Sequence, residues 1–250
     1  MAREDEQRIS DRMFFVGCAG WSVPKTWAER FPAPGTHLER YAARFPCVEI
    51  NSSFYRPHRP QTYSKWAALV PDSFRFAVKV PKSITHQHRL QETDELLAAF
   101  LSEVGGLSDQ LGPLLVQLPP SLAFDQAVSE TFFSALRERF AGQVVCEPRH
   151  ASWFEPQAGD LLAGMRVARV AADPAIVPQA ALPGGWSGLN YFRLHGSPTI
   201  YRSAYSAQFV EELAAKMQEQ SVPTWCIFDN TAEGAATGNA LQLGEQLRSI

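Results

Sequence analysis

The sequence predicts a single (β/α)8-like barrel of the TIM type, and three observations lead to this fold class. Eight short apolar runs rich in β-branched and aromatic residues recur along the 250 residues. Segments with helical periodicity lie between most of these runs, and no low-complexity linker divides the chain. Strands that alternate with helices form a parallel sheet with right-handed crossovers, and eight repeats in a chain of this length fit such a barrel.

The predicted strands are apolar runs that end at polar or turn-forming residues. In chain order they are Phe14 to Cys18, Cys47 to Asn51, Phe74 to Val80, Pro113 to Leu118, Gln143 to Glu147, Arg166 to Ala171, Gly188 to His195 and Thr224 to Asp229.

The predicted helices each carry one apolar face. Between Val128 and Phe140, for example, apolar side chains recur every four residues, so one stripe faces the strands. The expected helices are His37 to Phe45, Gln61 to Leu69, Asp94 to Val104, Asp125 to Phe140, Gln157 to Ala163, Ser206 to Gln220 and Glu233 to Leu247.

The segment between strands six and seven breaks this pattern. From Asp173 to Gly188 it contains three prolines and a Gly-Gly pair, so we expect an irregular loop in place of a helix. A doubly wound open sheet is the alternative architecture, but its G-x-G-x-x-G signature does not follow the first strand. We expect residues 1–12 to be a flexible tail and residues 13–250 a single domain.

The composition is that of an ordinary globular protein. It is 45% hydrophobic and 20% charged, with a formal net charge of -3, so neither a nucleic-acid partner nor a membrane partner is favoured. No apolar run approaches the roughly 18 residues of a membrane helix, and the N-terminus is charged, which favours a cytoplasmic location. The four cysteines show no C-x-x-C spacing and are expected to be buried free thiols. Nothing indicates the oligomeric state.

Polar side chains end every predicted strand after the first, and active sites of TIM-type barrels lie at that end of the strands. Residues two apart in a strand share a face, so three strands each project two polar side chains together. The strand ends are Glu49-Ile-Asn51, Lys79, Gln117, Glu147-Pro-Arg-His150, Asp173, Arg193-Leu-His195 and Asp229-Asn230. Inward projection towards the mouth avoids burying these groups against apolar helices.

These segments belong to longer blocks that resemble the signature of the YecE-like family, domain-of-unknown-function family 72. The similarity runs in order from residue 14 to about residue 245. Its blocks are Gly17-Cys-Ala-Gly-Trp-Ser22, Val48-Glu-Ile-Asn-Ser-Ser-Phe-Tyr-Arg56, Phe74-Arg-Phe-Ala-Val-Lys-Val-Pro81, Leu111-Gly-Pro-Leu-Leu-Val-Gln-Leu-Pro-Pro120, Glu147-Pro-Arg-His-Ala-Ser-Trp153, Tyr191-Phe-Arg-Leu-His-Gly196 and Phe228-Asp-Asn230. The resemblance implies a TIM-type barrel with these residues gathered at one end, and it supplies no reaction.

The charges at the mouth predict an enzyme that binds a small phosphorylated or carboxylated substrate. Guanidinium groups match such anions in a bidentate way, so Arg149, Arg193 and Lys79 are expected to hold the anion. Glu147 or Glu49 would act as general base, with His195 as the partner acid. The remaining candidates for substrate binding are Asn51, Gln117, Asn230, Trp21, Tyr55, Arg56 and His150. By alternation His150 lies on the other face, where it would instead cap a helix or line a loop.

Several alternatives stay open. In one, the mouth charges neutralise one another and Lys79 is the counter-ion of Glu49. In another, Lys79 is a Schiff-base nucleophile. A divalent metal bound by Glu49, Glu147, His195 and Asp229 would indicate a phosphodiester hydrolase, but no metal-ligand motif is present and two arginines lie close, so no cofactor is predicted. The last alternative is a non-catalytic module that binds a metabolite or nucleic acid.

Overall fold

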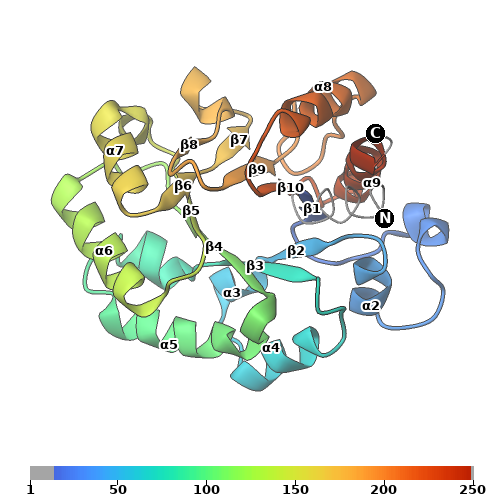
Figure 1. The fold of residues 1–250 in the computed structure, drawn as a ribbon, viewed down its shortest axis with the longest axis horizontal. Helices are drawn as coiled ribbons and strands as arrows, with labels where there is room; N and C mark the ends of the chain where they lie inside the picture. Colours follow the sequence, from blue (N-terminus) through green and yellow to red (C-terminus); the bar gives the residue numbers. More distant parts are fainter. Residues whose placement is uncertain (1–13, 249–250) are drawn as a thin grey trace.

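Strands and helices alternate along residues 14–248, the part of the chain that the computed structural model describes (Figure 1). The predicted tail, residues 1–12, lies outside this range. The strands are β1 (Phe14–Cys18), β2 (Cys47–Ile50), β3 (Arg75–Lys79), β4 (Leu111–Gln117), β5 (Val144–Glu147), β6 (Val167–Arg169), β7 (Ala171–Asp173), β8 (Gly184–Gly185), β9 (Asn190–Leu194) and β10 (Thr224–Phe228). The fold is therefore of the α/β class.

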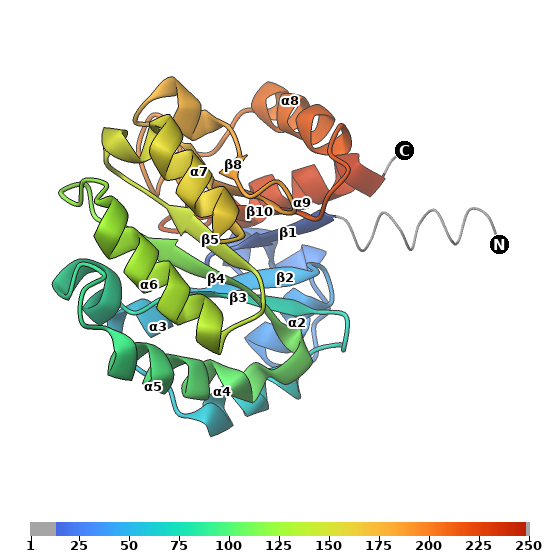
Figure 2. The ribbon, with the colours of Figure 1, turned by 60° about the vertical axis from the view of Figure 1, so that its left-hand side comes forward.

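The helices follow the apolar stripes of the sequence, and some of them begin at side-chain caps. Asp125 accepts a hydrogen bond from the Val128 N–H at 2.9 Å, and Ser206 accepts one from the Phe209 N–H at 3.2 Å. The helices are α2 (His37–Ala42), α3 (Ser52–Tyr55), α4 (Pro60–Ala67), α5 (Asp94–Val104), α6 (Gln126–Arg139), α7 (Pro156–Gly164), α8 (Ala207–Gln218) and α9 (Ala235–Arg248). Helices α5, α6 and α7 follow one another along the outside of the strands (Figure 2).

The strands form two sheets, in the orders β1-β10-β9-β7 and β2-β3-β4-β5-β6-β8. All pairs are parallel except β6 with β8. The sheets adjoin where Ala19 bridges Glu49 and the Gly20 N–H donates to the Glu49 carbonyl at 2.9 Å. A Cβ on Gly17 would lie 2.3 Å from the Cys47 carbonyl oxygen, so the close approach of β1 to β2 requires glycine there.

The predicted sixth strand is divided into β6 and β7 by Val170, whose N–H still donates to the Cys146 carbonyl at 2.8 Å. This run pairs with β5 at its start and with β9 at its end, so it belongs to both sheets. The segment after Asp173 contains a 3-10 helix (Pro178–Ala181) and the two residues of β8 but no α-helix, as its prolines predict.

Alternating strand residues separate the core into two parts. The larger cluster lies between strands and helices and includes Cys146, whereas Val145 belongs to a second cluster with side chains of the other strands. Val145 therefore lies on the opposite face of β5 from Cys146, as the alternation of strand side chains requires. All four cysteines are buried and free. Within residues 14–248 no helix is both long and apolar enough to cross a membrane.

Candidate functional site

Arg193 is the centre of a buried ionic cluster at the carboxyl ends of the strands. Its Nη2 lies 2.7 Å from Glu49 Oε1 and its Nε lies 3.0 Å from the same oxygen. Its Nη1 lies 3.1 Å from Glu147 Oε2, and Nη2 lies 3.1 Å from Asp229 Oδ2. The Arg193 side chain is 1% exposed. Four strands, β2, β5, β9 and β10, therefore meet at one guanidinium through residues that end or follow them.

His195 lies beside this guanidinium with both ring nitrogens engaged. Nδ1 is 3.0 Å from Asp229 Oδ2, and Nε2 is 2.8 Å from Glu147 Oε1. Arg149 Nη2 is 2.6 Å from that same Glu147 oxygen and 2.8 Å from His195 Nε2. A protonated Nε2 donates to Glu147, whereas an unprotonated Nε2 accepts from Arg149. A proton at this one atom therefore decides how three side chains are bonded.

The charges of the cluster favour the ionised forms of its members. Burial would raise the pKa of the Glu147 carboxyl, but Arg193, His195 and Arg149 hold it well below its ordinary value. The pKa of Asp229 is likewise lowered despite burial, chiefly by Arg193. Burial opposes protonation of His195, but Glu147 and Asp229 outweigh it and raise the pKa of the imidazole.

Lys79 ends β3 in the same region and is 8% exposed. Its Nζ lies 4.1 Å from the centre of the Phe54 ring, and within residues 14–248 no carboxylate oxygen lies within 4.0 Å of it. Burial and then Arg193 lower the pKa of this amine to about 8, against the opposing charges of the carboxylates. Lys79 forms no ion pair with Glu49 among the described residues, because Arg193 and the Tyr191 hydroxyl, at 2.8 Å, already bind the Glu49 oxygens. The charge of Glu49 still acts on the lysine by raising its pKa.

Gln117 also contacts the cluster, and two predicted residues, Arg149 and Asn51, have buried polar atoms without a partner. Gln117 donates from Nε2 to Glu147 Oε2 at 3.1 Å. The Arg149 side chain is 19% exposed, yet its Nε is buried and has no hydrogen-bond partner within the described residues. The Oδ1 atom of Asn51, just beyond β2, is also buried without a partner there. Buried polar atoms normally have partners, so these atoms indicate where a ligand or ordered water would bind.

The remaining predicted residues make their contacts elsewhere. Asn230 donates from Nδ2 to the Ser203 carbonyl at 2.9 Å and to Asn239 Oδ1 at 3.1 Å, which holds a loop, and its own Oδ1 is buried without a partner among the described residues. His150 caps the 3-10 helix Ala151–Phe154 by accepting from the Ser152 N–H at 3.2 Å, as its position on the other face predicts.

The aromatic and basic candidates from the first two loops are separate from the cluster as well. Trp21 packs edge-on against Trp66 with ring centres 5.0 Å apart. Tyr55 is 69% exposed and Arg56 is exposed, so neither side chain is enclosed in a preformed site.

Tyr201 is a neighbour of the cluster that the candidate residues did not include. Its ring lies edge-on to His195 with centres 5.8 Å apart, and its φ of 68° is unusual for a side chain of this size. The Ala232 N–H donates to its carbonyl at 3.0 Å, which ties the loops after β9 and β10 together. The only available signal was an aromatic residue soon after the Arg193-Leu-His195 strand end.

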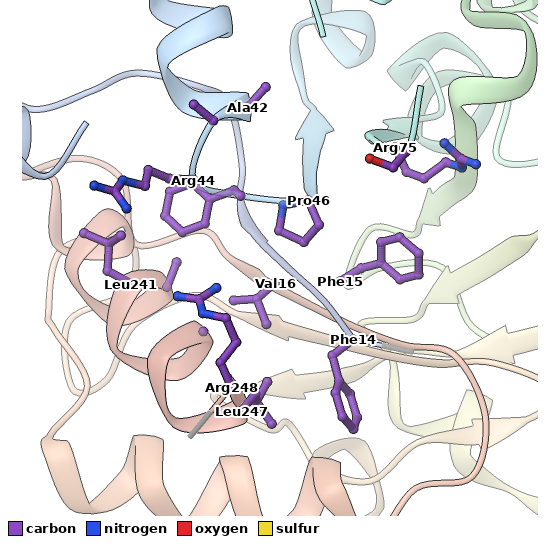
Figure 3. Close-up of a pocket in the computed structure, with 15 residues that line it drawn as sticks. Phe14, Phe15, Val16, Ala42, Arg44, Pro46, Arg75, Leu241, Leu247 and Arg248 are labelled. Carbon is purple, nitrogen blue, oxygen red and sulfur yellow. The ribbon is translucent and has the colours of Figure 1, made fainter. Parts of the chain in front are cut away.

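A large cavity lies at the opposite end of the strands. It measures about 840 Å³ and is lined by residues that precede or begin strands, such as Phe14, Pro46 and Arg75, together with Arg248 (Figure 3). A second cavity of about 520 Å³ lies between the loops that follow β1, β9 and β10. Only the second is on the side where barrels of this kind bind substrates.

Residues 15–249 match the family model described as "Protein of unknown function DUF72". The chain belongs to the DUF72 family. A relative, UPF0759 protein YecE of Escherichia coli K12, is 36% identical over 107 residues, which are 43% of this chain and 38% of YecE. UPF0759 protein YunF of Bacillus subtilis 168 is 28% identical over 158 residues, 58% of this chain and 53% of YunF. The chain thus matches about half or less of the length of these relatives.

A solved DUF72 structure covers nearly the whole chain. The DUF72 family protein of Thermotoga maritima MSB8 has a TM-score of 0.78 at 26% identity and covers 95% of this chain and 100% of its own. At 11% identity, 3-keto-L-gulonate-6-phosphate decarboxylase from Vibrio cholerae has a TM-score of 0.53 and covers 94% of this chain and 97% of its own. At that identity the likeness concerns the fold alone, which resembles those of TIM-barrel proteins.

Proposed function

We propose that this DUF72 protein is an enzyme that binds a small phosphorylated or carboxylated substrate at the carboxyl ends of its strands. In this proposal residues 13–250 are one domain, and the two sheets form a closed (β/α)8-like barrel through the Ala19–Glu49 bridge and the shared run at Val170. The ionic cluster then lies at the barrel mouth, where such folds carry out their chemistry.

The observation that carries the proposal is that the cluster has more positive groups than its carboxylates neutralise, and one hydrogen-bond donor without an acceptor. Arg193 is engaged by three carboxylates, but Arg149 has an Nε without an acceptor and Lys79 has no carboxylate within 4.0 Å among the described residues. With His195 protonated, four cations face the three carboxylates of Glu49, Glu147 and Asp229, which leaves one positive charge. A small anion would supply both the missing charge and the missing acceptor.

His195 is the proposed acid–base group. It can release its Nε2 proton because Arg149 is then ready to donate to the same nitrogen, so the site stays hydrogen-bonded in both states. Asp229 orients the ring through Nδ1, as a carboxylate does in many acid–base pairs. The assignment of Arg193 changes accordingly: it positions Glu49 and Glu147, and it is too deeply buried to be the first contact of an anion.

Binding of inorganic phosphate and of small carboxylates tests the proposal by calorimetry or by NMR shift changes. Arg149→Met should weaken binding about tenfold or more, because a hydrogen bond to a charged group contributes roughly 1.5–3 kcal/mol. Arg139→Met is the matched control, since Arg139 is exposed at the end of α6, outside both cavities, and is paired with Asp94 at 2.8 Å. Equal affinity in all three proteins would overturn the proposal.

Two alternatives fare differently. A metal-dependent phosphodiester hydrolase would need a cation between Glu49 and Glu147, and the Arg193 guanidinium occupies that place. No group of three His, Cys, Asp or Glu suited to a metal occurs within residues 14–248. A non-catalytic metabolite-binding module would bind the same anions without converting them. For an enzyme, His195→Gln should abolish turnover of a substrate while anion binding remains.

A further inference from the structure

The carboxylates around Lys79 are all taken by other donors. Glu49 binds Arg193 and Tyr191, and Asp229 binds Arg193 and His195. Glu147 accepts hydrogen bonds from Arg193, Arg149 and Gln117. It accepts a fourth from His195 when that imidazole is protonated at Nε2. A lysine placed among three acids is thus left with an aromatic face as its nearest described partner. Lys79 therefore faces the carboxylate charges without an ion pair of its own among the described residues.

We propose that Lys79 is an amine nucleophile that forms a protonated imine with the carbonyl carbon of the substrate, which makes that substrate a small anionic aldehyde or ketone such as a 2-oxo acid. This deepens the proposed function and rests on it, because the anion is held at Arg149 while the amine attacks. The substrate class follows from the two unused groups together: one binds an anion, and the other adds to a carbonyl.

The lysine is held in place by its backbone. Ser53 Oγ, buried next to it, donates to the Lys79 carbonyl at 2.7 Å and to the Ile50 carbonyl at 3.1 Å, which joins the end of β3 to the end of β2. The following residue, Phe54, lays its ring over Nζ and is itself packed edge-on by His86 with ring centres 5.0 Å apart. One side of the amine is therefore apolar, which shields an imine from water.

The electrostatic surroundings favour the reactive form of the amine. The charged groups that face it are Glu49 on β2, Glu147 on β5, Arg193 on β9 and Asp229 after β10. His86, in the helical turn Ser83–Gln87 after β3, also faces it, and burial and Lys79 lower the pKa of its imidazole. Burial and Arg193 lower the pKa of Lys79 to about 8 from an ordinary 10.5. At neutral pH the fraction of unprotonated amine is then on the order of a hundredfold larger than for an exposed lysine.

The step is balanced without any further reactant. The amine nitrogen forms a bond to the carbonyl carbon, the carbonyl oxygen takes up two protons, and it leaves as water. Overall an ammonium and a carbonyl become an iminium and water, so the positive charge among the carboxylates is retained. The iminium withdraws electrons from the neighbouring carbon.

Trapping with glyoxylate, a small anionic aldehyde, and cyanoborohydride at pH 7 tests this inference. Mass spectrometry of the peptides should find Lys79 reduced to a stable adduct at least about tenfold faster than Lys82, given the difference in amine pKa. Lys82 is the control because it lies three residues away and is more exposed. Acetaldehyde, which lacks the carboxylate, should label Lys79 more slowly than glyoxylate does.

Two outcomes separate this inference from the proposed function. If the protein binds glyoxylate reversibly but Lys79 is labelled no faster than Lys82, the imine is refuted and the anion site stands. If Lys79 is labelled rapidly and Arg149→Met does not slow the reaction, the imine stands and the anion site at Arg149 is refuted. Lys79→Arg, checked for folding by thermal unfolding, should show no adduct at that position.

Discussion

Replacement of Arg193 by methionine should destabilise the protein strongly. The change removes the guanidinium that contacts Glu49, Glu147 and Asp229 and leaves these acids without their shared partner. Glu49 and Glu147 are fully buried, so water cannot take over the role of the arginine. Removing one member of a buried ion pair costs about 3–5 kcal/mol, and we expect a loss of at least this size at pH 7.

The pH dependence of this loss has a defined sign. In the wild type the pKa values of Glu147 and Asp229 are lowered on folding, so the stability they contribute is present above their unfolded pKa of about 4 and is lost as the pH falls through the folded values. The variant lacks most of this contribution, and in it burial alone raises the pKa of the carboxyls. As the pH falls from 7 towards 4, these carboxyls become protonated in the folded variant and their burial costs less. The difference in unfolding free energy between wild type and variant is therefore largest at pH 7 and narrows towards pH 4.

Urea unfolding followed by circular dichroism at pH 7 and at lower pH measures both effects. Arg202→Met is the matched control, because an exposed pair such as Arg202–Glu233 contributes about 0–1 kcal/mol. Arg193→Lys, which keeps one charge but loses the planar fork, should fall between the two. A stability of Arg193→Met within about 1 kcal/mol of the wild type at pH 7 would refute the reasoning.

Three other expectations concern separate features of the molecule. NMR titration of the His195 imidazole should give a pKa above the ordinary 6.5, and Asp229→Asn should lower that pKa. The protonated imidazole contributes its full stability below pH 6.5, and this contribution is lost as the pH rises through the pKa of the folded protein. Gly17→Ala should cost about 1–3 kcal/mol in urea unfolding because its Cβ meets the Cys47 carbonyl, whereas Gly159→Ala should not destabilise. The buried thiols, such as Cys18 with a pKa raised to about 12, should react with Ellman's reagent only after unfolding.

Each of these has a contrary result that is simple to recognise. An Asp229→Asn protein with an unchanged imidazole titration would mean that the carboxylate does not support the charge on His195. Equal unfolding midpoints for the two glycine variants would mean that β1 does not approach β2 as described. Rapid native thiol labelling would contradict the burial of the cysteines.

The strand faces could be predicted from the sequence because side chains alternate with a period of two. Glu147, Arg149 and His195 do come together, as this rule and the expected barrel require. The rule does not say how far a long side chain reaches along or across the strands. For this reason the sequence left a Lys79–Glu49 pair open as an alternative, whereas in the structure Arg193, 144 residues from Glu49, reaches that carboxylate.

Features that depend on loop geometry escaped prediction for a different reason. Tyr201 adopts a positive φ that sequence patterns associate with glycine or asparagine, so nothing marked it as a fixed neighbour of His195. Asn230 is adjacent in sequence to a member of the cluster, yet its amide bonds to Ser203 and Asn239. The sixth strand is likewise divided at Val170 because its first part pairs with β5 and its last part pairs with β9. The composition of the segment does not encode this change of partner.

The position of Arg193 in the chain has a consequence for folding. Its acidic partners Glu49 and Glu147 are synthesised well before it, and the contact with Glu49 spans 144 residues. A nascent chain that stops short of β9 would hold those carboxyls in a forming core with no cation to meet them, so its early strands gain by staying open to water. Docking of β9 and assembly of the site are then one event, and a fragment ending before residue 193 should not fold stably by itself.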